Sequence, residues 1–440
     1  GGMSPHSLLQ EYLNLTEEHL YAVLTNGLKL RLLRDASRLV RLSFVEFDLE
    51  RIMEDELYTD FAVLYRILHA SRMPSDSQNP AGCFLEKYHQ KSLVEGARIR
   101  DGLSGAVEKA ILMFGCGFLE HPSNEILRKN ILEGKTDAHE YLHSVMMLIY
   151  RLLFLMVIEE RDLVFEKNAD TRLRKIYENY YSLDSLRRRC TLNVPGNRNA
   201  DDLWTGLKQT FRLFEDGGRG RVLGISPLAG DLFASDALGL LTRCSLDNTV
   251  LGSAVVNLNW FQNPGSGTYT RVNYSSLNVE ELGSVYESLL EYDAAIESSN
   301  SKMRLKLVKG TERGTSGTHY TPEELTQPLI RHSLDALIAE RLKSDEPEKA
   351  LLSLKILDSA AGSGHILLSA SRRLGLELAR VRTGSEQPSP SEYRSAVRDV
   401  IKNCIYGVDK NPLAVELCKV SLWLESHQPG EPLGFLDHRI

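Results

Sequence analysis

The sequence predicts a mainly α-helical N-terminal region over residues 1–295, followed by the first part of an α/β domain of the Rossmann-like kind over residues 296–440. Three observations lead to this fold class. A strand, glycine loop and helix pattern lies around residue 358, and a second strand and helix pattern lies around residue 409. The first 290 residues are mainly helical by pattern and contain no internal repeat.

The first strand-helix unit contains Asp-Ser-Ala-Ala-Gly-Ser-Gly-His at residues 358–365. A short apolar run precedes it, and apolar residues at helical spacing follow over residues 366–382. Because Gly362 and Gly364 lack a Cβ, the backbone can turn sharply and approach a ligand closely. An acid at a strand end followed by such a loop and a helix predicts a site for a nucleotide-like cofactor.

The second unit begins with an apolar run over residues 404–408 and continues into Asp409. After it, apolar residues fall on one helical face, namely Leu413, Leu417, Val420 and Leu424. Asp358 and Asp409 are 51 positions apart, whereas a plain dinucleotide fold places its second acid about 20 residues on. The sequence therefore predicts an insertion, with a turn at 384–391 and a second helix at 392–402.

A Gly-Thr-His-Tyr-Thr-Pro segment at residues 317–322 precedes both units. This order of motifs resembles the adenine-N6 DNA methyltransferases, above all the large methylases of type IIG restriction-modification and of the BREX and DISARM phage-defence systems. The resemblance implies a Rossmann-like domain that binds S-adenosylmethionine. Asp358 and the neighbouring backbone would face its methionine part, and Asp409 would take the ribose hydroxyls. The implied cofactor-binding residues are Tyr320, Thr321, Pro322, Asp358, Ala360, Gly362, Ser363, Gly364, Asp409 and Lys410.

The chain departs from this family in three ways. Ser359 stands where the family usually has proline, and Ala361 where it usually has cysteine. The Asn-Pro-Pro-aromatic motif that performs the family's chemistry is absent from the sequence, so no catalytic residue is assigned. We interpret His365 as a pocket-lining residue at a helix start rather than as a base.

Two strand-helix units do not complete a parallel sheet, since such sheets are normally covered on both faces and an open edge exposes unpaired backbone groups. We therefore expect the remaining strands and the catalytic loop to come from a C-terminal remainder of the enzyme or from a partner subunit. The isolated chain is then expected to be inactive.

The function implied by the resemblance is site-specific transfer of a methyl group from S-adenosylmethionine to adenine N6 in double-stranded DNA. The setting would be bacterial restriction-modification or antiviral defence, with other defence-system proteins as partners. One alternative is a non-catalytic DNA-recognition or assembly subunit with a vestigial cofactor fold. Another is a type IIG enzyme with a fused nuclease; we interpret its candidate acids, Asp48, Glu50, Asp55 and Glu56, as a solvated helix face.

Composition indicates an ordinary soluble protein, with 42% hydrophobic and 25% charged residues among 440. The most apolar stretch, Val145 to Ile158, contains Arg151 and predicts a core helix, so no membrane partner is expected. Six scattered cysteines without a Cys-x-x-Cys pair predict reduced thiols in the cytoplasm and no metal site.

The net charge of −7 argues against a chain that coats DNA by itself. A positive run precedes the Tyr-Thr-Pro segment and could meet phosphates, although a solvated linker is the favoured interpretation. Its members are Lys302, Arg304, Lys306, Lys309 and Arg313.

Overall fold

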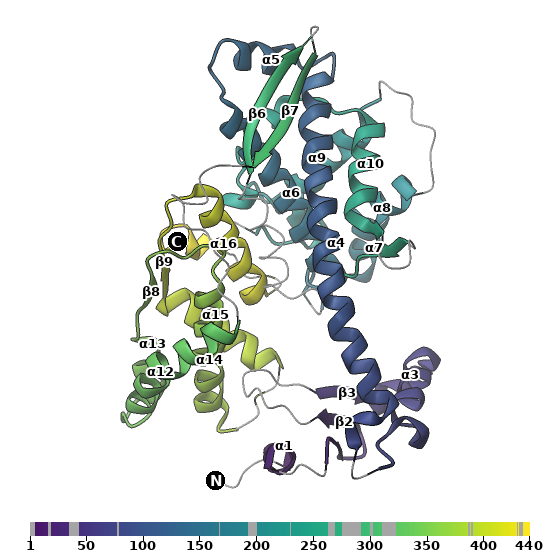
Figure 1. Ribbon diagram of the computed structural model, residues 1–440, viewed down its shortest axis with the longest axis vertical. Helices are drawn as coiled ribbons and strands as arrows, with labels where there is room; N and C mark the ends of the chain where they lie inside the picture. The colour runs from purple at the N-terminus through teal and green to yellow at the C-terminus, as the bar shows by residue number, and fades with distance from the viewer. Residues whose placement is uncertain are drawn as a thin grey trace. The chain divides into compact units, whose positions relative to one another are not determined.

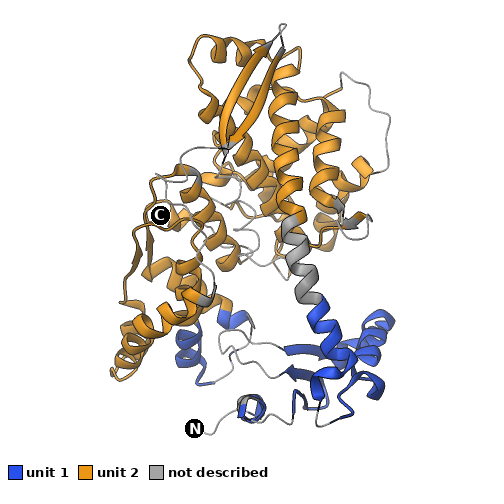
Figure 2. Ribbon diagram, in the orientation of Figure 1, with its two compact units in different colours: residues 1–97, 376–393 blue, residues 98–375, 394–440 orange. Residues whose placement is uncertain are grey.

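The structure is a computed structural model of the 440-residue chain (Figure 1). It describes residues 5–15, 19–34, 44–76, 79–166, 168–191, 200–228, 230–262, 269–274, 292–299, 302–309, 323–385, 388, 390–428, 430 and 434–440. The chain divides into two compact units (Figure 2). The first contains residues 1–97 and 376–393, and the second contains residues 98–375 and 394–440.

The first unit contains a three-stranded antiparallel sheet in the order β1-β2-β3. Its elements are α1 (Pro5–Leu15), β1 (Tyr21–Thr25), β2 (Lys29–Arg34), β3 (Phe44–Asp48), α2 (Leu49–Glu54), α3 (Tyr58–Leu68), the short turns η1 (Ala70–Arg72) and η2 (Pro80–Gly82), and the start of α4 (Phe84–Glu120). The prediction of a mainly helical region did not include this sheet. Asn26 and Gly27 form the turn between β1 and β2, where Gly27 adopts φ +89°.

The four acids considered for a nuclease do not share one helix face, which corrects that interpretation. Asp48 ends β3 and caps α2 by accepting the Arg51 N–H at 3.1 Å. Glu50 lies in α2, whereas Asp55 and Glu56 form the turn that follows it. All four side chains are exposed, as expected for solvated charges.

The second unit begins with a helical region built around α6. Its helices are the remainder of α4, α5 (Glu125–Leu132), α6 (Ala138–Glu160), α7 (Thr171–Tyr180), α8 (Leu183–Thr191), α9 (Asp202–Phe214) and α10 (Asn248–Asn259), with the 3-10 turns η3 (Arg219–Leu223), η4 (Asp231–Phe233) and η5 (Gly239–Arg243). Every residue from Val145 to Ile158 is buried, so the predicted core helix is confirmed. The one charged side chain among them, Arg151, donates to the Leu232 and Ala234 carbonyls at 2.6 and 2.5 Å.

Two of these helices could cross a membrane by length and composition alone, over Gly102–Glu120 and Ala138–Glu160. Their apolar windows are 56% and 89% buried inside the protein. A buried core helix passes the same test, so the finding is weak evidence for a membrane span.

Two antiparallel hairpins complete the helical region: β4 (Trp260–Gln262) with β5 (Tyr269–Arg271), and β6 (Tyr292–Ser299) with β7 (Lys302–Lys309). The second hairpin corrects the linker interpretation of the positive run, because four of its five residues lie in strand β7. The fifth, Arg313, lies outside the described residues. Met303 and Leu305 are buried, while Arg304 and Lys306 between them are exposed. Arg304 pairs with Glu120 at 3.0 Å, and Lys306 pairs with Glu297 at 2.7 Å.

From β8 (Ile356–Asp358) onward, the C-terminal part follows the predicted order of strands and helices. Its elements are α12 (Glu323–Arg341), α13 (Pro347–Leu352), β8 (Ile356–Asp358), α14 (His365–Thr383), α15 (Pro390–Cys404), β9 (Ile405–Gly407), α16 (Pro412–Ser426) and the turn η7 (Gly434–Leu436). β8 and β9 pair in parallel, with Asp358 opposite Gly407. The two predicted strand-helix units and the two-helix insertion between them are therefore confirmed. A parallel pair needs such a crossover connection.

Candidate functional site

The candidate site lies where β8 and β9 end side by side, since the carboxyl ends of parallel strands meet at one edge of a sheet. Beyond the strand pairing, the Val408 N–H donates to the Asp358 carbonyl at 2.9 Å. The Ala361 N–H donates in turn to the Val408 carbonyl at 2.9 Å. These two bonds bring the glycine loop and the segment containing Asp409 together.

Asp409 is bonded directly to the glycine loop. Its Oδ2 accepts the Gly362 N–H at 2.9 Å, across 47 positions of sequence. Its Oδ1 accepts the Asn411 N–H at 2.9 Å and so shapes the turn into α16. A carboxylate has about four lone-pair sites, so both oxygens can accept further hydrogen bonds from a ligand.

Asp358 has one engaged oxygen and one free oxygen. Its Oδ1 accepts the Ala360 N–H at 3.0 Å. Its Oδ2 is buried and has no hydrogen-bond partner among the described residues. A buried carboxylate oxygen without a donor is unfavourable. The site therefore fits a ligand that supplies a donor to Asp358, such as an ammonium or a hydroxyl group.

Four N–H groups of the loop are already engaged in hydrogen bonds. Those of Ala360 and Gly362 donate to the two aspartates, and those of Ala361 and Gly364 donate to carbonyls. Loops that bind phosphate point free N–H groups at the ligand. This loop instead presents carboxylate oxygens, so its chemistry suits a positively charged or hydroxyl-bearing ligand better than a pyrophosphate.

The two glycines have different surroundings. Gly362 adopts φ +52°, and a Cβ built on it would meet no described atom within 4 Å, so the space beside it is open. Gly364 adopts φ +83°, and a Cβ there would lie 2.7 Å from the Cys418 Sγ of α16. Gly364 therefore permits a left-handed turn and the close approach of α16. Burial raises the pKa of the Cys418 thiol, and the nearby carboxylates of Asp358 and Asp409 raise it further.

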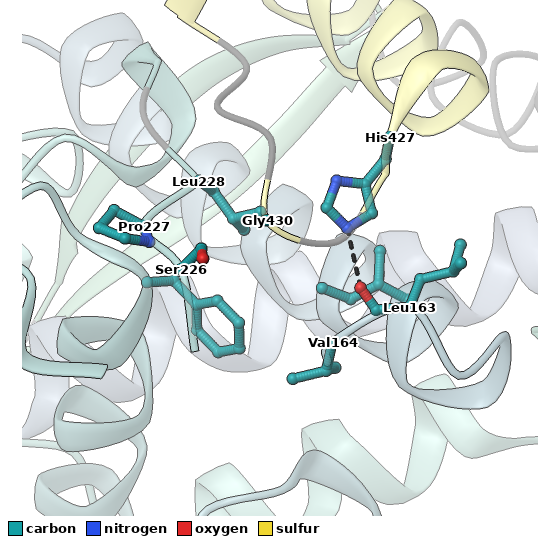
Figure 3. Close-up of a pocket in the computed structure, with 9 residues that line it drawn as sticks. Leu163, Val164, Ser226, Pro227, Leu228, His427 and Gly430 are labelled. Atoms are coloured by element: carbon teal, nitrogen blue, oxygen red, sulfur yellow. Dashed lines mark hydrogen bonds between the residues drawn. The ribbon is translucent and has the colours of Figure 1, made fainter. Parts of the chain in front are cut away.

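Helix α16 also packs against the helical region. The buried Lys419 pairs with Asp231 of η4, and the Trp423 ring approaches Gly230. At the end of α16, His427 Nε2 donates to the Leu163 carbonyl at 2.9 Å, as Figure 3 shows. The cavity beside this ring has a volume of about 10 Å³, which is room for about one water molecule. Burial lowers the pKa of His427 to about 4, so the ring is neutral.

Among the predicted site residues, the structure brings Asp358, Ala360, Gly362, Gly364 and Asp409 together. Ser363 is buried within the loop, and Lys410 is exposed beside it. Tyr320, Thr321 and Pro322 lie outside the described residues. His365 is the first residue of α14 and is buried.

Sequence reasoning missed two residues that shape the site. Asn411 precedes Pro412 at the start of α16, and an Asp-x-Asn-Pro pattern is a recognisable turn signal. Cys418 carried no such signal, since its contact with Gly364 joins α16 to a loop that is distant in the sequence.

Comparison with known proteins supports the interpretation of this region. Residues 278–429 match the model of the N-6 DNA Methylase family. The match covers most of the C-terminal part of the chain, including the glycine loop and Asp409.

A curated relative from Methanocaldococcus jannaschii, named "Putative type II restriction enzyme and methyltransferase RM.MjaORFECS2P", is 26% identical over 318 residues. The alignment covers 63% of this chain but only 24% of that protein. Among solved structures, the type IIL restriction-modification enzyme MmeI, determined in complex with DNA, is 19% identical with a TM-score of 0.41. That match covers 73% of this chain and 36% of MmeI.

Proposed function

We propose that this chain is part of a site-specific DNA methyltransferase that transfers a methyl group from S-adenosylmethionine to adenine N6. Its setting is a restriction-modification or phage-defence system in the bacterial cytoplasm. The observation that carries the proposal is the pair of aspartates at the ends of two adjacent parallel strands, joined to the glycine loop through the Gly362 N–H. The match to the N-6 DNA Methylase family supports it.

The donor set of the site fits S-adenosylmethionine. The free Oδ2 of Asp358 would accept from the cofactor's ammonium group, and the carboxylate of Asp409 would accept from its ribose hydroxyls. The open space beside Gly362 would admit the ligand close to the backbone. Tyr320, Thr321 and Pro322 would close the pocket, and Ser363 and Lys410 would border it. β8 and β9 would then be the first two strands of a Rossmann-like sheet.

When bound, the cofactor supplies an electrophilic methyl group on a positively charged sulfur. The residues of this chain would hold and orient that group, because the Asp358 carboxylate would bind the ammonium group and the Asp409 carboxylate the ribose hydroxyls. Orientation of this kind is a large part of catalysis by proximity. The substrate we propose is double-stranded DNA, from which the adenine leaves the stack so that its amine reaches the cofactor.

The test is calorimetry of S-adenosylmethionine with the full chain. Wild type is expected to bind it, and Asp409→Ala is expected to weaken binding at least tenfold, since it removes a charged acceptor. Asp345→Ala, at an exposed aspartate in the turn before α13, is the matched control and is expected to bind like wild type. NAD serves as a second ligand, and it is expected not to bind because the site presents the carboxylates of Asp358 and Asp409 to its negatively charged pyrophosphate.

Loss of S-adenosylmethionine binding in Asp409→Ala, with binding retained in wild type and Asp345→Ala, would support the proposed methyltransferase. Absence of binding by wild type would favour the alternative of a recognition or assembly subunit with a vestigial cofactor fold. Binding of NAD with equal affinity would contradict the donor argument.

A further inference from the structure

A pocket of about 320 Å³ lies in the first compact unit, between β3, α2 and α3. Its lining combines four apolar and four charged side chains, which are Phe47, Ile52, Leu57 and Val63, and Glu46, Asp48, Arg51 and Asp60. Phe47 and Ile52 are buried, so the floor is part of the small core beneath the sheet. The volume lies at the lower end of the range of ligand pockets, about 300 to 1,000 Å³.

Two carboxylates at the rim of this pocket have no cationic partner. Asp48 accepts only the backbone N–H of Arg51, and Asp60 is in reach of only the Thr59 hydroxyl at 3.5 Å, among the described residues. By contrast, the third rim acid, Glu46, pairs with Lys29 at 3.2 Å and Arg31 at 2.6 Å. Arg51 also lines the pocket, but its guanidinium pairs with Asp55 at 3.4 Å. The pocket thus combines an apolar floor with two acids that have no ion-pair partner among the described residues.

Helix α3 exposes apolar side chains beside the pocket. Although most of its residues are apolar, none of them is buried. Tyr58 is 79% exposed, Tyr65 59% and Val63 49%, and the neighbouring Met53 of α2 is 63% exposed. Exposed apolar surface gathered around a cavity marks interaction sites more often than isolated exposed residues do.

The charge of this segment narrows the choice of partner. Residues 44–69 contain seven acidic and two basic residues, a net charge of −5 within a chain of net charge −7. Such a surface repels the phosphates of DNA, an anionic membrane and a second copy of itself. It complements a positively charged protein segment.

We propose that this pocket and the exposed face of α3 form a docking site for a basic, amphipathic segment of a partner protein. A lysine or arginine of that segment lays its aliphatic stem on Phe47 and Ile52, and its charge meets Asp48 and Asp60. Apolar residues of the same segment cover Tyr65 and Met53. Long basic side chains bury their stems in this way while the charged end stays at the rim.

The test measures fluorescence anisotropy of a labelled synthetic helical peptide of leucine and lysine, titrated with the full chain. A peptide with glutamate in place of lysine and a labelled DNA duplex are the comparison probes. The site variant is Asp60→Lys/Val63→Lys, which changes two exposed positions of α3. The matched control is Asp345→Lys/Val222→Lys, which makes the same exchanges at an exposed aspartate and a valine that is 79% exposed elsewhere.

Wild type is expected to bind the lysine peptide, and the site variant is expected to bind it with an affinity at least about tenfold lower. The reason is that contacts at the centre of an interface carry most of the affinity. The control variant is expected to change the dissociation constant less than about twofold, since it alters net charge equally but not the pocket. Both double variants should unfold at the temperature of wild type, because the exchanged side chains are exposed.

An equal loss of affinity for the lysine peptide in the two double variants would overturn the proposal, since it would show that the peptide responds only to the net charge of the chain. Binding of the glutamate peptide or the DNA duplex as tight as that of the lysine peptide would overturn it as well. The result is independent of the proposed function, because S-adenosylmethionine binding by the site variant is expected to match wild type whether or not the peptide binds.

Discussion

The sharpest prediction concerns Asp358→Asn, which changes one atom of the candidate site. The asparagine Oδ1 can still accept the Ala360 N–H, so the loop keeps its bond of 3.0 Å. The amide nitrogen replaces Oδ2, which is buried and has no partner among the described residues. The substitution therefore removes a charged acceptor that no described residue uses and that a ligand could use.

Stability and affinity are expected to respond differently. Without ligand, the free energy of unfolding should not fall and is expected to stay within about 1 kcal/mol of wild type, because the replaced oxygen is buried and has no donor among the described residues. A hydrogen bond to a charged group contributes about 1.5 to 3 kcal/mol. The affinity for S-adenosylmethionine should therefore fall about 10- to 150-fold.

Urea unfolding with and without S-adenosylmethionine measures both quantities. At a ligand concentration of about 100 times the wild-type dissociation constant, wild type gains about 2.7 kcal/mol of stability. The variant should gain only about 0.3 to 1.4 kcal/mol by the same relation. Asp345→Asn is the control and should behave as wild type in both measurements. An unchanged ligand gain in Asp358→Asn would refute the assignment of Oδ2 to the cofactor.

Two further predictions concern the packing around the site. Gly364→Ala places a Cβ 2.7 Å from the Cys418 Sγ at φ +83°, and it is expected to lower the free energy of unfolding in urea by about 2 to 4 kcal/mol. The control is Gly384→Ala, at φ +63° with no described atom within 4 Å, which should lower it by only about 1 kcal/mol. Equal losses in the two variants would contradict the close contact. Because burial lowers the pKa of His427 to about 4, the unfolded chain takes up the proton first as the pH falls below about 6.5. The free energy of unfolding should therefore decrease as the pH falls from 6.5 to 4, by up to about 1.4 kcal/mol per pH unit. The difference in stability between wild type and His427→Gln, measured by thermal unfolding across this range, should change with the same slope. A difference that stays constant with pH would refute the prediction.

The strands and helices of the site could be predicted because several local signals coincide there. The apolar run before Asp358, the two glycines and the helical spacing after His365 each indicate the same strand, loop and helix. The second strand-helix unit adds an acid, Asp409, just after the end of its strand. The bond from the Gly362 N–H to Asp409 follows from this placement, since adjacent parallel strands bring their ends together.

The antiparallel strands were harder to predict because their signals are short or share residues with another pattern. Asn26-Gly27 is a strong hairpin signal, but the strands beside it have only five and six residues. In β7 the alternation of buried Met303 and Leu305 with Arg304 and Lys306 is a strand pattern. The same charges gave the appearance of a linker when they were considered without the apolar residues between them.

Long-range packing left no trace in local patterns. Lys419 and Asp231 are 188 positions apart, and nothing in either segment indicates the other. Similarly, the approach of Cys418 to Gly364 depends on how α16 lies against the loop. Periodicity gives the buried face of a helix but not the partner of that face.

These unpredicted contacts explain why the helical region and the candidate site belong together. On one side of α16, Cys418 lies against the glycine loop, and the next residue, Lys419, is buried against Asp231 of the helical region. The alignment with the Methanocaldococcus jannaschii relative spans 318 residues, more than residues 278–429 contain, so the similarity extends beyond the family-matched part. Because a helix packed on both sides transmits a shift from one neighbour to the other, the helical region would help to fix the position of the glycine loop.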